Sequence, residues 1–288
     1  MATLRTIRRR IASVKSTQQI TKAMKMVAAA RLRKAQERML RARPYAKSLD
    51  ELLGHVAAKV DPSLHPLLQV REPKRVAFVV VTGDRGLCGS FNANIIRRGA
   101  NEMNASRQSN LEIELITVGK KGFEHFNRRH YPIIEKYINF FDKLDFSHAQ
   151  DIAALIKEKY IDGQFDRIYL VYNEFKSAIQ QNIIVQQLLP IVPRPPQDEK
   201  YAADYIFEPS PIKLLDKLCP LYLNIEIWHA LLESFAAEMG ARMAAMGAAS
   251  DNAKELIIQL TLYYNKVRQA SITRELMDIV GGAEALKK

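Results

Sequence analysis

Cysteine is scarce in this 288-residue chain, which contains only Cys88 and Cys219 and has no CxxC motif. A disulfide framework or a cysteine-rich zinc site needs more thiols than this, so we expect two free, reduced cysteines. The six histidines show no metal-ligand spacing such as HExxH. We therefore expect no metal, no cofactor and no nucleophilic-cysteine chemistry.

Long apolar runs are also missing. The longest, Val76–Val81, is far shorter than the ~20 residues that a membrane-spanning helix requires. The amino-terminal residues lack the apolar core of a secretory signal, and their helical pattern continues past residue 40, unlike a transit peptide. The sequence predicts an intracellular chain that does not itself cross a membrane.

Acidic residues are nearly absent from one segment. Residues 1–48 contain 14 lysines and arginines against the single acid Glu37, so the segment carries +13, while the whole chain carries +12. All the excess charge therefore lies in this segment. Such a concentration predicts a specific acidic partner for it, either phosphate or protein.

Helix-forming residues dominate both ends of the chain. From Leu4 to Ala42, alternate steps of three and four residues reach twelve positions, nine of them apolar, and Pro44 is expected to kink or open this helix. From Leu214 to Met277 the same steps reach nineteen positions, seventeen of them apolar. This 3.5-residue period is typical of a coiled coil. We expect the second helix to begin at Pro220 and to extend on the order of 100 Å.

Both helices join one middle region through short linkers, so they most simply pair antiparallel, and the small residues of segment 241–250 suit a close approach. Counted outward from the middle region, the second helix is longer by roughly 20 residues, so about 30 Å of it should project beyond residue 1. This end is apolar, and we expect a partner to surround it. Its large apolar side chains are Ile272, Leu276, Ile279, Val280 and Leu286.

Strand and helix patterns alternate in the middle region, which predicts an α/β domain with a largely parallel sheet. The expected strands are 74–81, 111–119, 131–140, 166–175 and 182–191, and the expected helices are 92–105, 120–130 and 147–161. The last two strands are joined by only KSAIQQ and should pair antiparallel. The predicted organisation is a coiled-coil helix (1–58), a linker (59–74), a Rossmann-like α/β foot domain (75–195), a linker (196–211) and a coiled-coil helix (212–288).

The turn TGDRGLCGSFNAN, residues 82–94, has the strand–glycine turn–helix order of a phosphate-binding loop. Its spacing is GxxGxxG, which is neither GxGxxG nor the GxxxxGK[ST] of a P-loop. The acid that would bind a ribose hydroxyl is missing after the second strand, which ends in TVGKK. The pattern favours a tight structural turn over a nucleotide site.

Two terminal blocks resemble one known family. IASVKSTQQITKAMKMVAAARLRKAQ (residues 11–36) and ASDNAKELIIQLTLYYNKVRQASITRELMDIVGGAEAL (residues 249–286) are similar to the terminal helices of the gamma subunit of the F-type ATP synthase. The pattern ITxExxDxxxGAxA fits residues 272–285, and TGDRGLCGSFN is similar to the first strand-turn of that family. The resemblance extends over the whole chain. The absence of an insert with a regulatory cysteine pair is typical of bacterial members.

The resemblance implies a central-stalk rotor: an antiparallel coiled coil inside a ring of alpha and beta subunits, with a foot domain against epsilon and the membrane c-ring. It implies ATP synthesis or hydrolysis at beta sites, a non-catalytic role for this chain, and peripheral attachment to the cytoplasmic face of the bacterial inner membrane. By similarity, the shaft contacts are Lys22, Met24, Lys25, Arg268, Gln269 and Thr273, and the foot contacts are Tyr205 and Glu208.

The residues also support one part of this expectation directly. Gln18, Thr21 and Lys25 interrupt the apolar stripe of the first helix, where a bearing surface rather than a helix partner is expected. Two other classes of protein remain as alternatives. A nucleotide-dependent α/β enzyme leaves the coiled coil unexplained, and a coiled-coil nucleic-acid-binding protein has only Tyr45 for base stacking in its basic segment.

Overall fold

The computed structural model describes residues 3–178, 180–193, 208 and 210–285. The chain divides into two compact units. The larger, Ala28–Arg242, is called here the sheet unit; the smaller combines Met1–Val27 with Met243–Lys288 and is called the helical unit. The boundaries expected from the sequence separate helices, linkers and an α/β domain, whereas these two units are compact groups of residues. The expected boundaries therefore stay a prediction.

Two long helices, α1 (Leu4–Ala57) and α5 (Pro211–Ala285), each contribute to both units. The predicted stripe of α1 is confirmed, because eleven of its twelve positions are buried or half-buried and only Lys25 is exposed. The stripe of α5 is buried or half-buried from Leu214 to Leu260, whereas its last three positions, from Ala270 to Met277, are exposed. Within the described chain, no helix is both long and apolar enough to cross a bilayer.

The expected start of the second helix was wrong. α5 begins at Pro211, and Pro220 lies inside it. Pro211 occupies the first helical position, where its missing N–H costs nothing, and the Ser210 Oγ accepts a hydrogen bond from the Lys213 N–H at 3.4 Å. The other proline expectation also needs correction in part, because α1 continues through Pro44 without interruption.

A five-stranded sheet forms the centre of the sheet unit, with strand order β3-β2-β1-β4-β5. β1, β2, β3 and β4 are parallel, and β5 pairs antiparallel with β4, as predicted. The strands are β1 (Arg75–Val81), β2 (Glu112–Val118), β3 (Ile133–Tyr137), β4 (Arg167–Phe175) and β5 (Gln181–Leu189).

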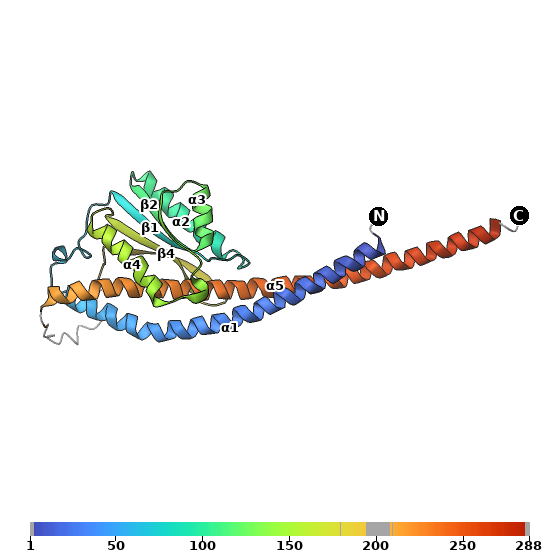
Figure 1. Ribbon diagram of the computed structural model, residues 1–288, viewed down its shortest axis with the longest axis horizontal. Helices are drawn as coiled ribbons and strands as arrows, with labels where there is room; N and C mark the ends of the chain where they lie inside the picture. Colours follow the sequence, from blue (N-terminus) through green and yellow to red (C-terminus); the bar gives the residue numbers. More distant parts are fainter. Residues whose placement is uncertain (1–2, 179, 194–207, 209, 286–288) are drawn as a thin grey trace. The chain divides into compact units, whose positions relative to one another are not determined.

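Helices cover both faces of this sheet (Figure 1). Alternate β1 residues Val76, Phe78 and Val80 pack in the core shared with α2 (Phe91–Gln108) and α3 (Lys120–Arg128). Ala77 and Val79 face the core shared with α4 (Phe146–Ile161) and α5. The uninterrupted apolar run of β1 is thus explained by burial on both faces.

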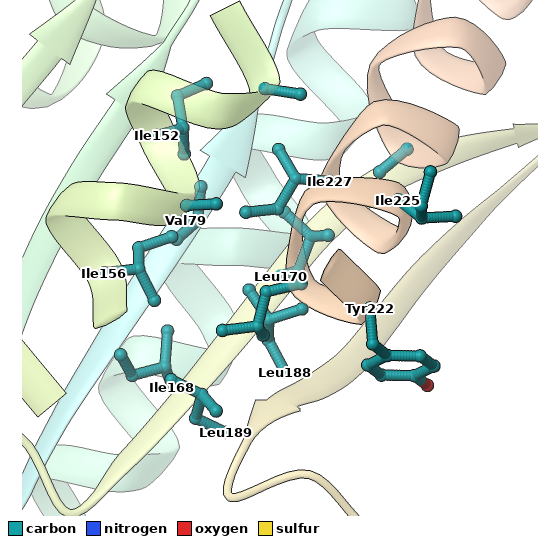
Figure 2. Close-up of a cluster of buried hydrophobic side chains, with 14 of the residues drawn as sticks. Val79, Ile152, Ile156, Ile168, Leu170, Leu188, Leu189, Tyr222, Ile225 and Ile227 are labelled. Atoms are coloured by element: carbon teal, nitrogen blue, oxygen red, sulfur yellow. The ribbon is translucent and has the colours of Figure 1, made fainter. Parts of the chain in front are cut away.

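The core between the sheet, α4 and α5 holds part of a long helix firmly against the α/β domain. Figure 2 shows Ile152 and Ile156 of α4 and Ile227 of α5 around Leu170 and Val79 of the strands. All five are at most 1% exposed. Full burial of each such side chain stabilises the fold by about 1.5–3 kcal/mol. In the sheet unit, α5 is therefore a core element of the domain and not only a helix that leaves it.

Candidate functional surfaces

The glycine turn follows β1 at the carboxyl end of the parallel strands. Leu87 and Gly89 have φ of +62° and +59°, so two of its residues lie in the left-handed region. The Gly83 N–H donates to the Asn92 Oδ1 at 2.8 Å, and the Asn92 side-chain amide donates to the Arg85 carbonyl at 3.2 Å. The turn is therefore closed onto the first residues of α2 by its own side chains.

Asp84 of this turn organises the neighbouring strand ends. Its Oδ1 accepts hydrogen bonds from the N–H groups of Lys120 and Asn139, both at 2.9 Å, and its Oδ2 accepts a longer one from Phe141 at 3.4 Å. The first of these donors begins α3 and the other two follow β3. These bonds use the acidic side chain and nearby amides for structure, which supports the interpretation of the turn as structural.

A buried ion pair on α5 lies directly under the turn. The Arg242 Nη2 is 2.6 Å from the Glu238 Oε1, and these side chains are 11% and 4% exposed. The same nitrogen donates to the Gly86 carbonyl at 3.2 Å. Burial raises the pKa of the Glu238 carboxyl, and the neighbouring guanidinium opposes that shift.

The same carboxylate explains the first glycine of the turn. A Cβ added at Gly83 would lie 2.8 Å from the Glu238 Cδ, closer than side-chain carbons approach. The absence of a side chain therefore allows the turn to lie directly on α5, which gives this glycine a packing role.

A second charged cluster ties α1 to the turn. Asp142, in the short helix η2 (Phe141–Lys143), accepts from the Arg31 Nη1 at 2.7 Å and from the Arg85 Nη2 at 2.6 Å. The hydrogen bond from Arg31 is the main cause of a lowered pKa of the Asp142 carboxyl. Together with the buried pair, this cluster links both long helices to the glycine turn within the sheet unit.

Neither cluster was predicted from the sequence. Arg31 and Asp142 are 111 residues apart, so no local pattern connects them. Glu238 and Arg242 offered a weak signal, because a glutamate four residues before an arginine can pair on one helix face. Arg242 is also one of only two polar residues in the apolar stripe of the second helix.

In the helical unit, α1 and α5 run antiparallel. The Arg8 Nη2 donates to the Tyr264 hydroxyl at 2.7 Å, with the guanidinium 5.6 Å from the centre of the ring. The side chain of Lys25 lies against Gly247, where an added Cβ would be 3.5 Å from the Lys25 Nζ. As the α1 number rises from 8 to 25, the contacting α5 number falls from 264 to 247, which fixes the antiparallel register.

This register leaves the end of α5 without a partner from α1. Leu4, where α1 begins, corresponds to Arg268, so α5 continues alone from residue 269 to 285 (Figure 1). At 1.5 Å per residue this part is about 25 Å long. The length agrees with the projecting helix expected from the sequence. Its exposed large apolar residues are Ile272 (48%), Leu276 (56%), Met277 (68%), Ile279 (68%) and Val280 (57%).

The predicted shaft-contact residues form two groups in the helical unit. Lys22 and Lys25 of α1 are exposed and Met24 is half-buried. The other group is also exposed: Arg268 is the last residue of α5 opposite α1, and Gln269 and Thr273 begin its unpartnered part. The register separates the two groups by about 30 Å along the helical pair. Of the predicted foot contacts, Glu208 is exposed and Tyr205 lies outside the described residues.

One interpretation of the polar breaks needs correction. Thr21 is only 8% exposed and bonds the Gln18 carbonyl, and Lys25 packs along Gly247 of α5. These positions therefore lie on the side of α1 that faces its helix partner. Short or flexible polar side chains can occupy such positions where the partner helix carries glycine. The use of Lys22 and Lys25 as contacts to another subunit stays a prediction.

These features define a class of protein: an antiparallel helical pair with an unpartnered apolar end, joined in one chain to a Rossmann-like α/β domain. A family model described as ATP synthase matches residues 3–286. The ATP synthase gamma chain of Chlorobaculum parvum is 50% identical over 292 residues, which cover 100% of both chains. The chain belongs to the gamma-chain family of the ATP synthases.

Solved structures agree with this assignment. A chain of the central stalk and c-ring of the Tetrahymena thermophila mitochondrial ATP synthase is 28% identical with a TM-score of 0.61, covering 80% of this chain and 99% of that one. A chain of the Euglena gracilis mitochondrial ATP synthase has a TM-score of 0.71 at 22% identity, covering 98% and 94%. The second likeness supports the fold alone.

Proposed function

We propose that this chain is the turning central shaft of an ATP synthase, which couples ion flow through a membrane c-ring to ATP synthesis or hydrolysis. The observation that carries the proposal is the family match over residues 3–286, on a chain whose helical unit ends in an unpartnered apolar helix. A cluster of exposed large apolar side chains on one helix end marks a surface that binds another molecule. A ring of alpha and beta subunits around the shaft supplies that partner.

In this proposal the chain has no catalytic residue of its own, and the catalytic sites lie on the beta subunits. The shaft acts by presenting different surfaces to the three beta subunits as it turns. Arg268, Gln269 and Thr273 contact the upper part of the ring, while Lys22, Met24 and Lys25 meet an acidic loop of beta. The charge of +13 on residues 1–48 supports an acidic partner at this position.

In this proposal, the torque from the c-ring acts on the sheet unit. We assign it the contacts to the epsilon subunit and the c-ring, with Tyr205 and Glu208 among the contact residues. A torque-bearing domain must not slip against its helices. The bridge from Arg31 through Asp142 to Arg85 and the buried pair Glu238–Arg242 oppose such slippage. Peripheral attachment at the cytoplasmic face of the bacterial inner membrane follows from the c-ring contact.

Reconstitution tests the proposal. The purified chain is combined with alpha and beta subunits of a related bacterial synthase, and ATP hydrolysis is measured with and without it. We expect a stable complex whose turnover depends on this chain, while the chain alone hydrolyses nothing. Failure to assemble, together with saturable nucleotide binding by the isolated chain, would reject the rotor in favour of an α/β enzyme.

The proposed contact of Lys22, Met24 and Lys25 with a beta subunit has its own test. Met24 is half-buried between the two lysines of its group. Met24→Lys adds a third cation there, so the charge opposite the acidic loop changes without a change in the core. We expect normal assembly but a lower ratio of ions pumped to ATP hydrolysed in the membrane-bound complex. Coupling equal to that of the parent complex would remove Met24 from the contact surface.

The alternative of a coiled-coil nucleic-acid-binding protein gains no support from the comparisons. It predicts tight binding of duplex or single strands by the isolated chain, with affinity that falls steeply as salt is raised. The rotor proposal predicts only weak, non-specific binding through the basic segment. A salt titration with a labelled oligonucleotide separates the two, because it needs no partner subunit.

A further inference from the structure

A basic cavity in the sheet unit is not used by the proposed rotor contacts. It has a volume of about 210 Å³ and lies between α1, η2 and the part of α5 around Leu232 and Phe235. Four cationic side chains line it, three from α1 and one from η2. They are Arg31, Lys34, Arg38 and Lys143.

The positive charge of this cavity is not neutralised from within. Asp142 is the only acid among the lining residues, and it is shared between Arg31 and Arg85. Arg38 donates to the neutral carbonyl of Leu144 at 3.2 Å. Among the described residues, Lys34 and Lys143 form no ion pair. The lining therefore carries four cations against the single carboxylate of Asp142, and a bound anion reduces the repulsion among the cations.

The floor of the cavity is apolar and partly aromatic. Phe141 is 5% exposed and Phe235 is half-buried, and their rings are stacked with centroids 6.3 Å apart. Leu144 and Leu232 complete the floor and are 6% and 1% exposed. A dry apolar cavity of about 150 Å³ holds one benzene ring, so this cavity has room for a ring and an attached oxyanion.

We propose that this cavity binds a small organic oxyanion, in which a phosphate or carboxylate meets the basic side chains and a single ring or short aliphatic group meets the apolar floor. Charge alone does not select this ligand, because an inorganic ion leaves the floor uncovered. All the lining residues belong to the sheet unit, so the site does not depend on the rotor contacts of the helical unit.

Phenyl phosphate is the probe, titrated into the full chain by calorimetry. We expect saturable binding that weakens as salt is raised, and weaker binding of both inorganic phosphate and benzyl alcohol, which each lack one half of the ligand. Lys34→Gln with Lys143→Gln removes two charged partners and should raise the Kd by at least about tenfold. The matched control, Lys213→Gln with Lys217→Gln, removes the same charge from exposed positions of α5 away from the cavity.

A second variant tests the floor. Phe235→Ala should weaken phenyl phosphate while leaving the weak binding of inorganic phosphate unchanged, which a general loss of folding cannot produce. The proposal is overturned by absence of saturable binding, by equal loss in both double-lysine variants, or by inorganic phosphate binding as tightly as phenyl phosphate. Equal loss in both double-lysine variants would indicate a diffuse basic surface. Equally tight binding of inorganic phosphate would indicate that the apolar floor does not contribute to binding.

Discussion

Replacing Arg242 by methionine should destabilise the sheet unit by several kcal/mol at neutral pH. The variant leaves the Glu238 carboxyl, which is 4% exposed, without its partner at 2.6 Å. Breaking a buried pair in this way costs about 3–5 kcal/mol. The unpaired carboxylate can lose its charge only by binding a proton. For a group with the ordinary pKa of 4.5, protonation at pH 7 costs about 3.4 kcal/mol. We therefore expect a loss of about 3 kcal/mol.

The pH dependence of this loss has a defined sign. Burial raises the pKa of Glu238, so the folded variant binds a proton that the unfolded chain releases. Its stability should therefore recover as the pH falls, by about 1.4 kcal/mol for each pH unit, until the pH reaches the unfolded pKa of 4.5. Wild-type protein should show a smaller dependence, because its guanidinium offsets the burial.

Urea unfolding followed by the fluorescence of Trp228 measures this effect. Trp228 is the only tryptophan of the chain, and its ring lies 5.8 Å from that of Phe146 in an edge-to-face arrangement, so it reports on the sheet unit. The double variant Glu238→Gln/Arg242→Met should recover most of the loss. Arg33→Met serves as control, because Arg33 is 82% exposed and its pair contributes under about 1 kcal/mol. A loss below about 1 kcal/mol for the Arg242 variant, or a loss that grows toward pH 5, would refute the reasoning.

Three further outcomes are expected. Gly119→Ala should destabilise the sheet unit by at least about 1–3 kcal/mol in the same urea assay, because Gly119 has φ of +94° and an added Cβ would lie 2.1 Å from the Thr82 carbonyl oxygen; an unchanged midpoint would contradict this. Asp142→Asn should lower the free energy of unfolding by less than about 1 kcal/mol, because the side chains of Arg31 and Asp142 are nearly half exposed. This difference in stability from wild type should vanish as the pH falls from 3.8 through the lowered pKa of Asp142. A difference that persists below that pH range would exclude the ion pairs as its cause. Truncation after Gln269 should leave the stability measured by Trp228 fluorescence unchanged, but it should weaken assembly with alpha and beta subunits and ATP-driven pumping. Full pumping by the truncated complex would exclude the apolar end of α5 as a contact surface for the ring.

Much of the fold could be predicted because its signals are periodic. The stripes of α1 and α5 and the fully apolar strand β1 each reflect burial along a regular element, which a sequence records directly. The short connection before β5 likewise determined its antiparallel pairing. The start of α5 was missed because Pro220 was interpreted alone, while the stronger start signal, Ser210 followed by Pro211, lay nine residues earlier.

The charged clusters could not be predicted for a different reason. The bridge between Arg31 and Asp142 depends on where the sheet unit places η2 beside α1, which is a tertiary property. The packing of Lys25 against α5 was missed for the same reason, because the glycine beside it lies 222 residues away in the sequence. The predicted contact of Lys25 with another subunit stays a prediction. Periodicity identified the side of α1 that faces a partner, but it could not say which polar residues that partner would accept.

The pairing of the two ends of the chain also dictates the order in which the protein can fold. The contact between Arg8 and Tyr264 joins residues 256 positions apart, so the first helix to leave the ribosome must wait for almost the whole chain before its partner exists. The strands β1 to β4 close their parallel ladders over shorter separations and can form first. During that interval the apolar stripe of α1 is exposed, and its many cations keep this waiting helix soluble and apart from its own copies.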